Sequence, residues 1–174
     1  MTCPPFTLRP PQLDDVLAYT RYLADADVSM WLDDSAQIPV SAARVEALLL
    51  RDAWCLWCID CEGSFVGVTS LYEPDMTRGM ARFSIVIGDR ACWNRGLGTA
   101  VLDRVLEHAF ISIGLRKIES EILEPNKAAQ VIHERAGFVK EGQLRQDSWR
   151  RGKWVDRIIL SLLREEWLER NPAR

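Results

Sequence analysis

Two glycines one residue apart stand in the segment NRGLGTAVL, residues 94–102, between the apolar run 85–87 and a segment with helical periodicity. Glycines at such a junction let backbone N–H groups approach an anion closely, and the start of the following helix attracts negative charge. The pattern predicts a site for a nucleoside triphosphate, a dinucleotide or the pyrophosphate of coenzyme A. A tight turn without a ligand is the alternative.

The residues around the glycines argue against the first two ligands. A phosphate-binding P-loop needs Lys and then Ser or Thr after its second glycine, whereas Gly98 is followed by Thr99 and Ala100. A dinucleotide fingerprint needs a third glycine, where Val101 stands, and an early position in a strand–helix–strand unit. Coenzyme A and a tight turn without a ligand are the two interpretations that remain.

The hydrophobic periodicity predicts the elements that position this loop. Apolar runs with alternation indicate strands, 3.6-residue spacing indicates helices, and Gly, Pro and Asn mark ends. Strands are expected at 6–10, 53–60, 65–73, 80–88, 115–124, 138–144 and 154–163, and helices at 13–23, from 41, at 100–113 and at 126–137, with short helical segments at 28–34 and 165–169. The alternation of strand and helix in the middle predicts locally parallel strands in a mixed α/β sheet.

A second block, NKAAQVIHERAGFVKEG, follows the glycine loop after one helix and one strand. The two blocks together resemble the GNAT superfamily of N-acetyltransferases over about residues 81–163. Trp93 and the segments 136–145 and 156–167 resemble most the branch with the ribosomal-protein alanine and spermidine N-acetyltransferases. The resemblance implies one α/β domain over 1–174, with a mixed central sheet of about six to seven strands, about four flanking helices and an acetyl-CoA-binding core at about 81–140.

The resemblance also assigns the contacts to acetyl-CoA. Backbone N–H groups at the start of the helix hold the pyrophosphate, arginines add charge, and the strand before the loop pairs with the pantetheine arm. The N–H of Val86 or Ile87 faces the thioester oxygen and stabilises the oxyanion. The expected cofactor-binding residues are Ile85, Val86, Ile87, Arg90, Asn94, Arg95, Gly96, Leu97, Gly98, Thr99, Ala100 and Asn126. Asn126 can equally be a helix N-cap, and both roles are compatible.

Two residues are candidates for proton transfer. His133 occupies the position of the tyrosine that many relatives use to protonate the departing thiolate, and histidine titrates near pH 6.5. The alternative for His133 is packing beside the cofactor. Arg82 replaces the glutamate that relatives often carry before the glycine loop, so the base is sought elsewhere. Glu73 is the remaining carboxylate candidate for the base. The alternatives are that Glu73 is a solvated carboxylate at a strand end, or that a water chain takes the proton.

In this family the acceptor is bound by the first helices, the turn after the third strand and the last hairpin. These regions carry Trp31, Asp33, Asp34 and Glu73, with Trp149 and Trp154 near the end. Carboxylates beside aromatic faces suit an ammonium group through ion pairing and cation–π contact. The alternative is that Trp31 packs in the core and that the acidic side chains are solvated.

Composition limits the remaining classes. A net charge of −3 argues against nucleic-acid binding, and the chain has neither a long apolar run for a membrane span nor a signal peptide. The cysteines of CLWCIDC alternate across a strand, so no metal site is expected, and five cysteines without a framework suggest a reducing, cytoplasmic compartment. A homodimer is compatible with this interpretation.

The predicted function is acetyl transfer from acetyl-CoA to a primary amine by direct attack in a ternary complex. The acceptor classes are a polyamine, an amino sugar or aminoglycoside-like compound, and a protein N-terminus. The alternative is a non-catalytic acyl-CoA-binding module on the same fold, because Arg82 stands in place of the usual glutamate.

Overall fold

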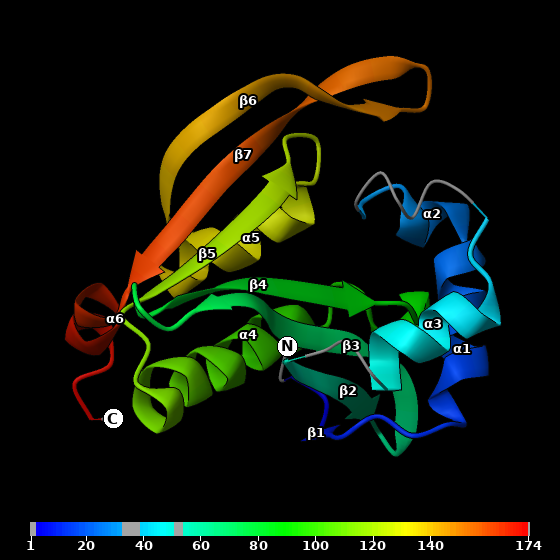
Figure 1. The fold of residues 1–174 in the computed structure, drawn as a ribbon, viewed down its shortest axis with the longest axis horizontal. Coiled ribbons are helices and arrows are strands. Elements are labelled where there is room, and N and C mark those ends of the chain that lie inside the picture. Colours follow the sequence, from blue (N-terminus) through cyan, green and yellow to red (C-terminus); the bar gives the residue numbers. More distant parts are fainter. Residues whose placement is uncertain (1–2, 33–38, 51–53, 174) are drawn as a thin grey trace. The chain divides into compact units, whose positions relative to one another are not determined.

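The computed structural model describes residues 3–32, 39–50 and 54–173 (Figure 1). The chain forms two compact units. The first contains Met1–Tyr72 and Ser84–Gly98, and the second contains Glu73–Phe83 and Thr99–Arg174. That residues 1–174 form a single domain stays a prediction.

Seven strands are linked by hydrogen bonds in the order β1-β2-β3-β4-β5-β7-β6. β4 and β5 are parallel, while β1 and β2, β2 and β3, β5 and β7, and β6 and β7 are antiparallel. The strands are β1 (Phe6–Arg9), β2 (Cys55–Cys61), β3 (Ser64–Asp75), β4 (Met80–Ile87), β5 (Lys117–Leu123), β6 (Val139–Arg150) and β7 (Lys153–Leu163). The mixed α/β sheet of six to seven strands is therefore confirmed.

The described residues contain six α-helices rather than about four. They are α1 (Asp15–Ala24), α2 (Ala26–Ser29), α3 (Ala42–Leu50), α4 (Leu97–Glu107), α5 (Lys127–Ala136) and α6 (Arg164–Arg170). The two additional ones, α2 and α6, are the short segments that the periodicity indicated near residues 28 and 165. α4 continues as a π-helical turn, His108–Ile113, and ends at Gly114, whose φ of 80° is the left-handed conformation expected after a helix.

The core of the first unit lies between α1, α3 and the strands β2 and β3. Apolar residues from these four elements form one buried cluster of Val16, Tyr19, Leu23, Val45, Leu49, Cys58 and Val68. In the expected helix 13–23, Leu13, Val16 and Leu17 stand at helical spacing that predicts one apolar face, but Leu13 lies before α1, and Leu13 and Leu17 are 66% and 63% exposed. The buried side of α1 is therefore narrower than its sequence suggests.

An ion pair fastens β1 to α1 in this unit. Arg9 donates from Nη1 and Nη2 to the Asp15 carboxylate, at 2.8 Å each, and from Nε to Asp60 at 2.7 Å. Burial by itself would raise the pKa of Asp15, but Arg9, the Gln12 N–H and the Cys58 thiol together hold it below its usual value. The charged side chain of Asp15 is thus tolerated at the edge of the apolar core because its oxygens are satisfied.

The second unit contains the long β6–β7 hairpin and the helices α5 and α6 (Figure 1). Phe110 packs against Trp167 of α6 with ring centroids 5.6 Å apart. β6 extends to Arg150. Residues 148–150, which were expected to lie between two strands, pair with residues 153–155 of β7 after an irregularity between Leu144 and Ser148, and Arg151 and Gly152 turn the chain. As the last strand of the sheet, β6 can expose polar side chains.

Gly67 holds β3 close to β4 in the first unit. A Cβ at Gly67 would lie 2.0 Å from the Val86 carbonyl oxygen, so no side chain fits there. We expect Gly67→Ala to lower the free energy of unfolding by about 2 kcal/mol through overpacking. Urea unfolding measures this difference. Gly142→Ala is the control, because nothing lies within 4 Å of a Cβ at Gly142. Equal stability of the two variants would contradict the close approach.

Candidate functional site

The end of β4 is held in place by backbone hydrogen bonds. The N–H groups of Gly88 and Asp89 donate to the Val66 carbonyl at 2.8 and 3.1 Å, and Trp93 Nε1 donates to the Ile87 carbonyl at 2.8 Å. A Cβ at Gly88 would lie 2.2 Å from Cγ of Tyr22, so the chain passes that ring without room for a side chain. Ile85, Val86 and Ile87 remain only half-buried, which leaves part of their surface free to contact a ligand.

The glycine loop connects this strand end to α4. Asn94 and Gly96 have φ values of 59° and 81°, in the left-handed region that glycine adopts without strain. Leu97 is buried and anchors the first turn of α4, whereas Asn94 and Gly96 are exposed. The first N–H groups of a helix lack acceptors within it. The arrangement therefore fits the predicted pyrophosphate contact of residues 94–100.

Both arginines predicted to assist the pyrophosphate are paired with carboxylates. Arg95 Nη2 lies 2.9 Å from Glu62 Oε1, and Arg90 Nη1 lies 2.8 Å from Asp27 Oδ2. Arg90 also lies over the Trp93 ring, 5.6 Å from its centroid. A phosphate that binds either guanidinium must therefore compete with a carboxylate of the same unit. The sequence pattern does not reveal this competition.

Asn126 begins α5 as an N-cap. Its Oδ1 accepts the Ala129 N–H at 3.0 Å, and Gly137, with φ of 99°, follows the last residue of the helix. The N-cap role is confirmed, while the pantetheine contact stays a prediction. Because Asn126 is only partly buried, it can make both interactions.

His133 is buried in the second unit and is held through both ring nitrogens. Nδ1 lies 2.8 Å from the Ala129 carbonyl oxygen, and Nε2 lies 2.8 Å from Ser120 Oγ. A carbonyl oxygen can only accept, so Nδ1 carries a proton. Burial lowers the pKa of His133, partly offset by the hydrogen bond to Ala129, and the neutral ring is the form at pH 7. In that form Nε2 accepts the Ser120 hydroxyl proton.

Arg82 belongs to a row of alternating charges in the second unit. It lies 3.4 Å from a Glu73 oxygen and 3.0 Å from a Glu121 oxygen, and Arg157 lies 3.3 Å from the other Glu121 oxygen. Arg157 also pairs with Asp147 at 2.6 Å. Glu73, whose side chain is 67% exposed, is the most accessible carboxylate of this row. Sequence reasoning named Arg82 and Glu73 but not Glu121, which reaches them only through strand pairing.

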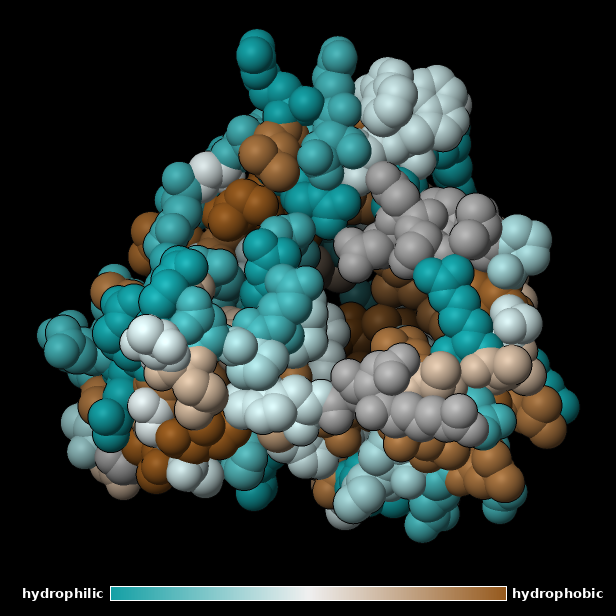
Figure 2. Space-filling model, viewed as in Figure 1, coloured by the Kyte–Doolittle hydropathy of each residue, from teal (hydrophilic) through white to brown (hydrophobic). Residues whose placement is uncertain are grey.

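The predicted acceptor residues are only partly described. Trp31 is half-buried, and Asp33 and Asp34 lie outside the described residues. Trp149 and Trp154 face each other across the β6–β7 hairpin with centroids 5.3 Å apart, and both are more than half exposed. Hydrophilic side chains cover most of the hairpin's visible side, and weakly polar ones gather at its turn (Figure 2). The exposed rings of Trp149 and Trp154 are available to an acceptor.

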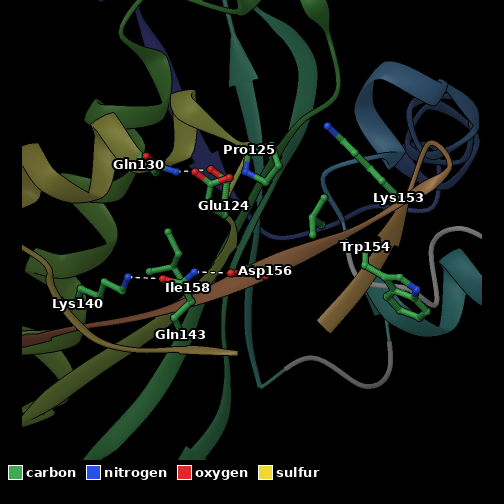
Figure 3. A pocket seen from close by; sticks show the side chains of 10 residues that line it. Glu124, Pro125, Gln130, Lys140, Gln143, Lys153, Trp154, Asp156 and Ile158 are labelled. Atoms are coloured by element: carbon green, nitrogen blue, oxygen red, sulfur yellow. Dashed lines mark hydrogen bonds between the residues drawn. The ribbon is translucent and has the colours of Figure 1, made fainter. Parts of the chain in front are cut away.

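The second unit also contains a polar pocket that sequence reasoning did not name. It has a volume of about 530 Å³ and lies where α5 begins beside the β6–β7 hairpin. Figure 3 shows Gln143 between Lys140 and Asp156, and Gln130 bonded to Glu124. Glu124 and Pro125, which directly precede Asn126, form one wall. Of the lining side chains, Lys140, Gln143 and Asp156 form one chain of hydrogen bonds, while Gln130 donates to the Glu124 carbonyl.

The fold and the loop define the class of protein. The profile of the acetyltransferase (GNAT) domain matches residues 6–139, and the chain belongs to this family of acetyltransferases. The family assignment made from the two sequence blocks is therefore confirmed. In the part of the chain that the structure describes, no helix is long and apolar enough to span a membrane.

Individual relatives lie in the predicted branch. The uncharacterized prophage-derived N-acetyltransferase YokL of Bacillus subtilis is 25% identical over 92% of this chain and 91% of its own. The spermidine N(1)-acetyltransferase of Vibrio cholerae is 26% identical over 64% of each chain. A solved structure of spermidine N-acetyltransferase from Vibrio cholerae with CoA and spermine has a TM-score of 0.82 at 21% identity, covering 94% of this chain and 98% of that one. The ribosomal L7/L12 N-acetyltransferase RimL, solved with coenzyme A, has a TM-score of 0.80 at 17% identity, covering 91% and 93%.

The buried, neutral His133 predicts a pH dependence of stability. Its pKa in the folded state lies below the unfolded value of 6.5, so the unfolded chain binds the extra proton first as the pH falls. The stabilisation is fully present above pH 6.5 and is lost as the pH falls through the folded pKa. Relative to His133→Gln, the wild type should lose unfolding free energy on acidification, measured by urea titration from pH 8 to 5. His108→Gln is the control, and parallel curves for wild type and His133→Gln would contradict the burial effect.

Proposed function

We propose that the protein transfers an acetyl group from acetyl-CoA to a primary amine within a ternary complex, without a covalent enzyme intermediate. The observation that carries the proposal is the glycine loop, in which the exposed, left-handed Gly96 directly precedes α4 and a 3₁₀ turn at Arg90–Cys92 separates it from the half-buried strand end 85–87. Family membership and CoA-bound structures of the same fold support acetyl-CoA as donor.

The chemistry needs an electrophile held in position and a route for one proton. Backbone N–H groups of Val86 or Ile87 polarise the thioester carbonyl, and the loop binds the pyrophosphate. His133, whose ring is neutral at pH 7, takes up the proton that the attacking amine loses and then supplies a proton to the departing thiolate. Glu73 is the accessible carboxylate for an acceptor ammonium group, and the Arg82 guanidinium at 3.4 Å orients it.

The acceptor that fits best is a small cationic amine. The exposed Trp149 and Trp154 rings supply cation–π surfaces, and Glu73 supplies negative charge. Named relatives act on spermidine or on a ribosomal protein. A polyamine therefore leads, with amino sugars and protein N-termini as the other candidate acceptors.

The decisive experiment mixes the protein with acetyl-CoA and a panel of polyamines, aminoglycosides and peptides with free N-termini. Thiol release gives the rate and mass spectrometry identifies the product. Glu73→Gln should raise KM for the accepted amine several-fold, whereas Glu134→Gln on the exposed side of α5 should not. If kcat falls instead while KM is unchanged, Glu73 is the base rather than an ammonium-binding group. Tight CoA binding without turnover of any amine would favour the non-catalytic acyl-CoA-binding module.

The pairing of Arg95 with Glu62 predicts opposite effects of two neutral substitutions. Glu62→Gln frees the guanidinium, so KM for acetyl-CoA should fall about threefold, whereas Arg95→Gln should raise it by about tenfold because a charge-assisted contact is lost. Steady-state kinetics at low salt measures both. Arg145→Gln on the exposed part of β6 is the control. Changes of the same sign in the two variants would remove Arg95 from the pyrophosphate site.

A further inference from the structure

Ser120 carries a buried hydroxyl group and is not among the predicted site residues. It lies on β5 and is 3% exposed, as is His133. Its Oγ is 2.8 Å from His133 Nε2 and 3.4 Å from the Phe83 carbonyl oxygen of β4. Because the hydroxyl has a single proton and both partners are acceptors, only one of them receives it at a time, and the shorter distance favours Nε2.

Ser120 stands at a particular point of the sheet. The parallel pairing of β4 with β5 runs from Met80 and Lys117 to Arg82 and Glu119, and Phe83 and Ser120 are the next residues on each strand. Phe83 directly precedes residues 84–87, the strand end to which the pantetheine arm is assigned.

Among the described residues, Ser120 Oγ is the only polar partner of His133 Nε2. Its Nδ1 is occupied by the Ala129 carbonyl, and the Phe83 and Phe138 rings stand edge-on to it at 5.9 and 4.9 Å. Any proton that leaves or reaches Nε2 in this arrangement passes through the Ser120 hydroxyl.

We propose that Ser120 and His133 form a proton-carrying pair, in which the Ser120 hydroxyl conveys protons between His133 Nε2 and the reacting atoms. The proposal rests on the proposed acetyl transfer and deepens it. It gives the chain a proton acceptor although Arg82 occupies the position of the usual glutamate.

The steps balance without a further reactant. As the amine attacks the carbonyl carbon, the π electrons move to oxygen, the nitrogen loses a proton to Ser120 Oγ, and the hydroxyl proton moves to Nε2. The oxyanion lone pair then re-forms the C=O bond as the C–S bond breaks, and the electron pair of the C–S bond stays on sulfur. Sulfur then takes the Ser120 proton while Nε2 returns its own. One pair can serve both steps because nitrogen and sulfur are bonded to the same carbon, and both residues end unchanged.

Ser120→Ala tests the pair kinetically. We expect kcat to fall about 100-fold, as for loss of an acid–base group, with KM for both substrates within about twofold. Ser120→Thr, which keeps a hydroxyl, should recover most of the rate. The double variant Ser120→Ala with His133→Gln should be no slower than the slower single variant, because the two act as a unit. Ser161→Ala is the control, a buried strand serine whose hydroxyl bonds Glu141.

Nitrogen NMR of the imidazole rings provides a readout without turnover. The chain has two histidines, so His108→Gln assigns the spectrum. We expect a neutral His133 with the proton on Nδ1, and a downfield shift of the Nε2 resonance in Ser120→Ala as its hydrogen bond is lost. A proton on Nε2 instead, or a kcat for Ser120→Ala equal to that of Ser161→Ala, would overturn the pair alone. Absence of turnover by the wild type with every amine would overturn the proposed function as well.

Discussion

The close approach of backbone to backbone at the end of β4 is the constraint on which the loop depends. Gly67 admits no side chain against the Val86 carbonyl, and Gly88 admits none against the Tyr22 ring. The Val66 carbonyl then accepts two successive N–H groups and directs the chain away from the sheet. These hydrogen bonds use the carbonyls of Val66 and Ile87 and the N–H groups of Gly88 and Asp89, so they hold the strand end without using the N–H of Val86 or Ile87. The loop that follows starts from a defined position, and this lowers the entropy lost when it orders around a phosphate.

The arginines of the glycine loop and of β4 are paired before any ligand arrives. Arg95 and Arg90 are held by carboxylates at the glycine loop, and Arg82 and Arg157 share Glu121 in the second unit. Such pairing keeps cations from attracting anions indiscriminately, and makes binding a matter of exchanging one partner for another. It also explains how Arg82 is accommodated on a strand where relatives often carry a glutamate: glutamates at positions 73 and 121 flank it.

Local signals allowed much of this structure to be predicted. The Asn126 cap, the left-handed glycines Gly114 and Gly137, and the glycine loop each follow from residue types within a few positions of one another. Contacts between distant residues were not accessible in the same way. Nothing near Ser120 in the sequence indicates that its hydroxyl meets His133, since 13 positions and a change from strand to helix separate them. Helical spacing likewise grouped Leu13 and Leu17 with Val16, although burial on one side of α1 depends on where β2 and β3 lie.

β4 belongs to both compact units, with its residues up to Phe83 in one and those from Ser84 in the other. The peptide bond between Phe83 and Ser84 joins the part of β4 that carries Arg82 to the part that is assigned to the thioester. Since side chains alternate in direction along a strand, an insertion or deletion of a single residue here would exchange the faces of everything beyond it. Substitutions along β4 can therefore accumulate one at a time, whereas changes in its length cannot. The number of residues between Met80 and Gly88 is therefore constrained, whereas their identities are less so.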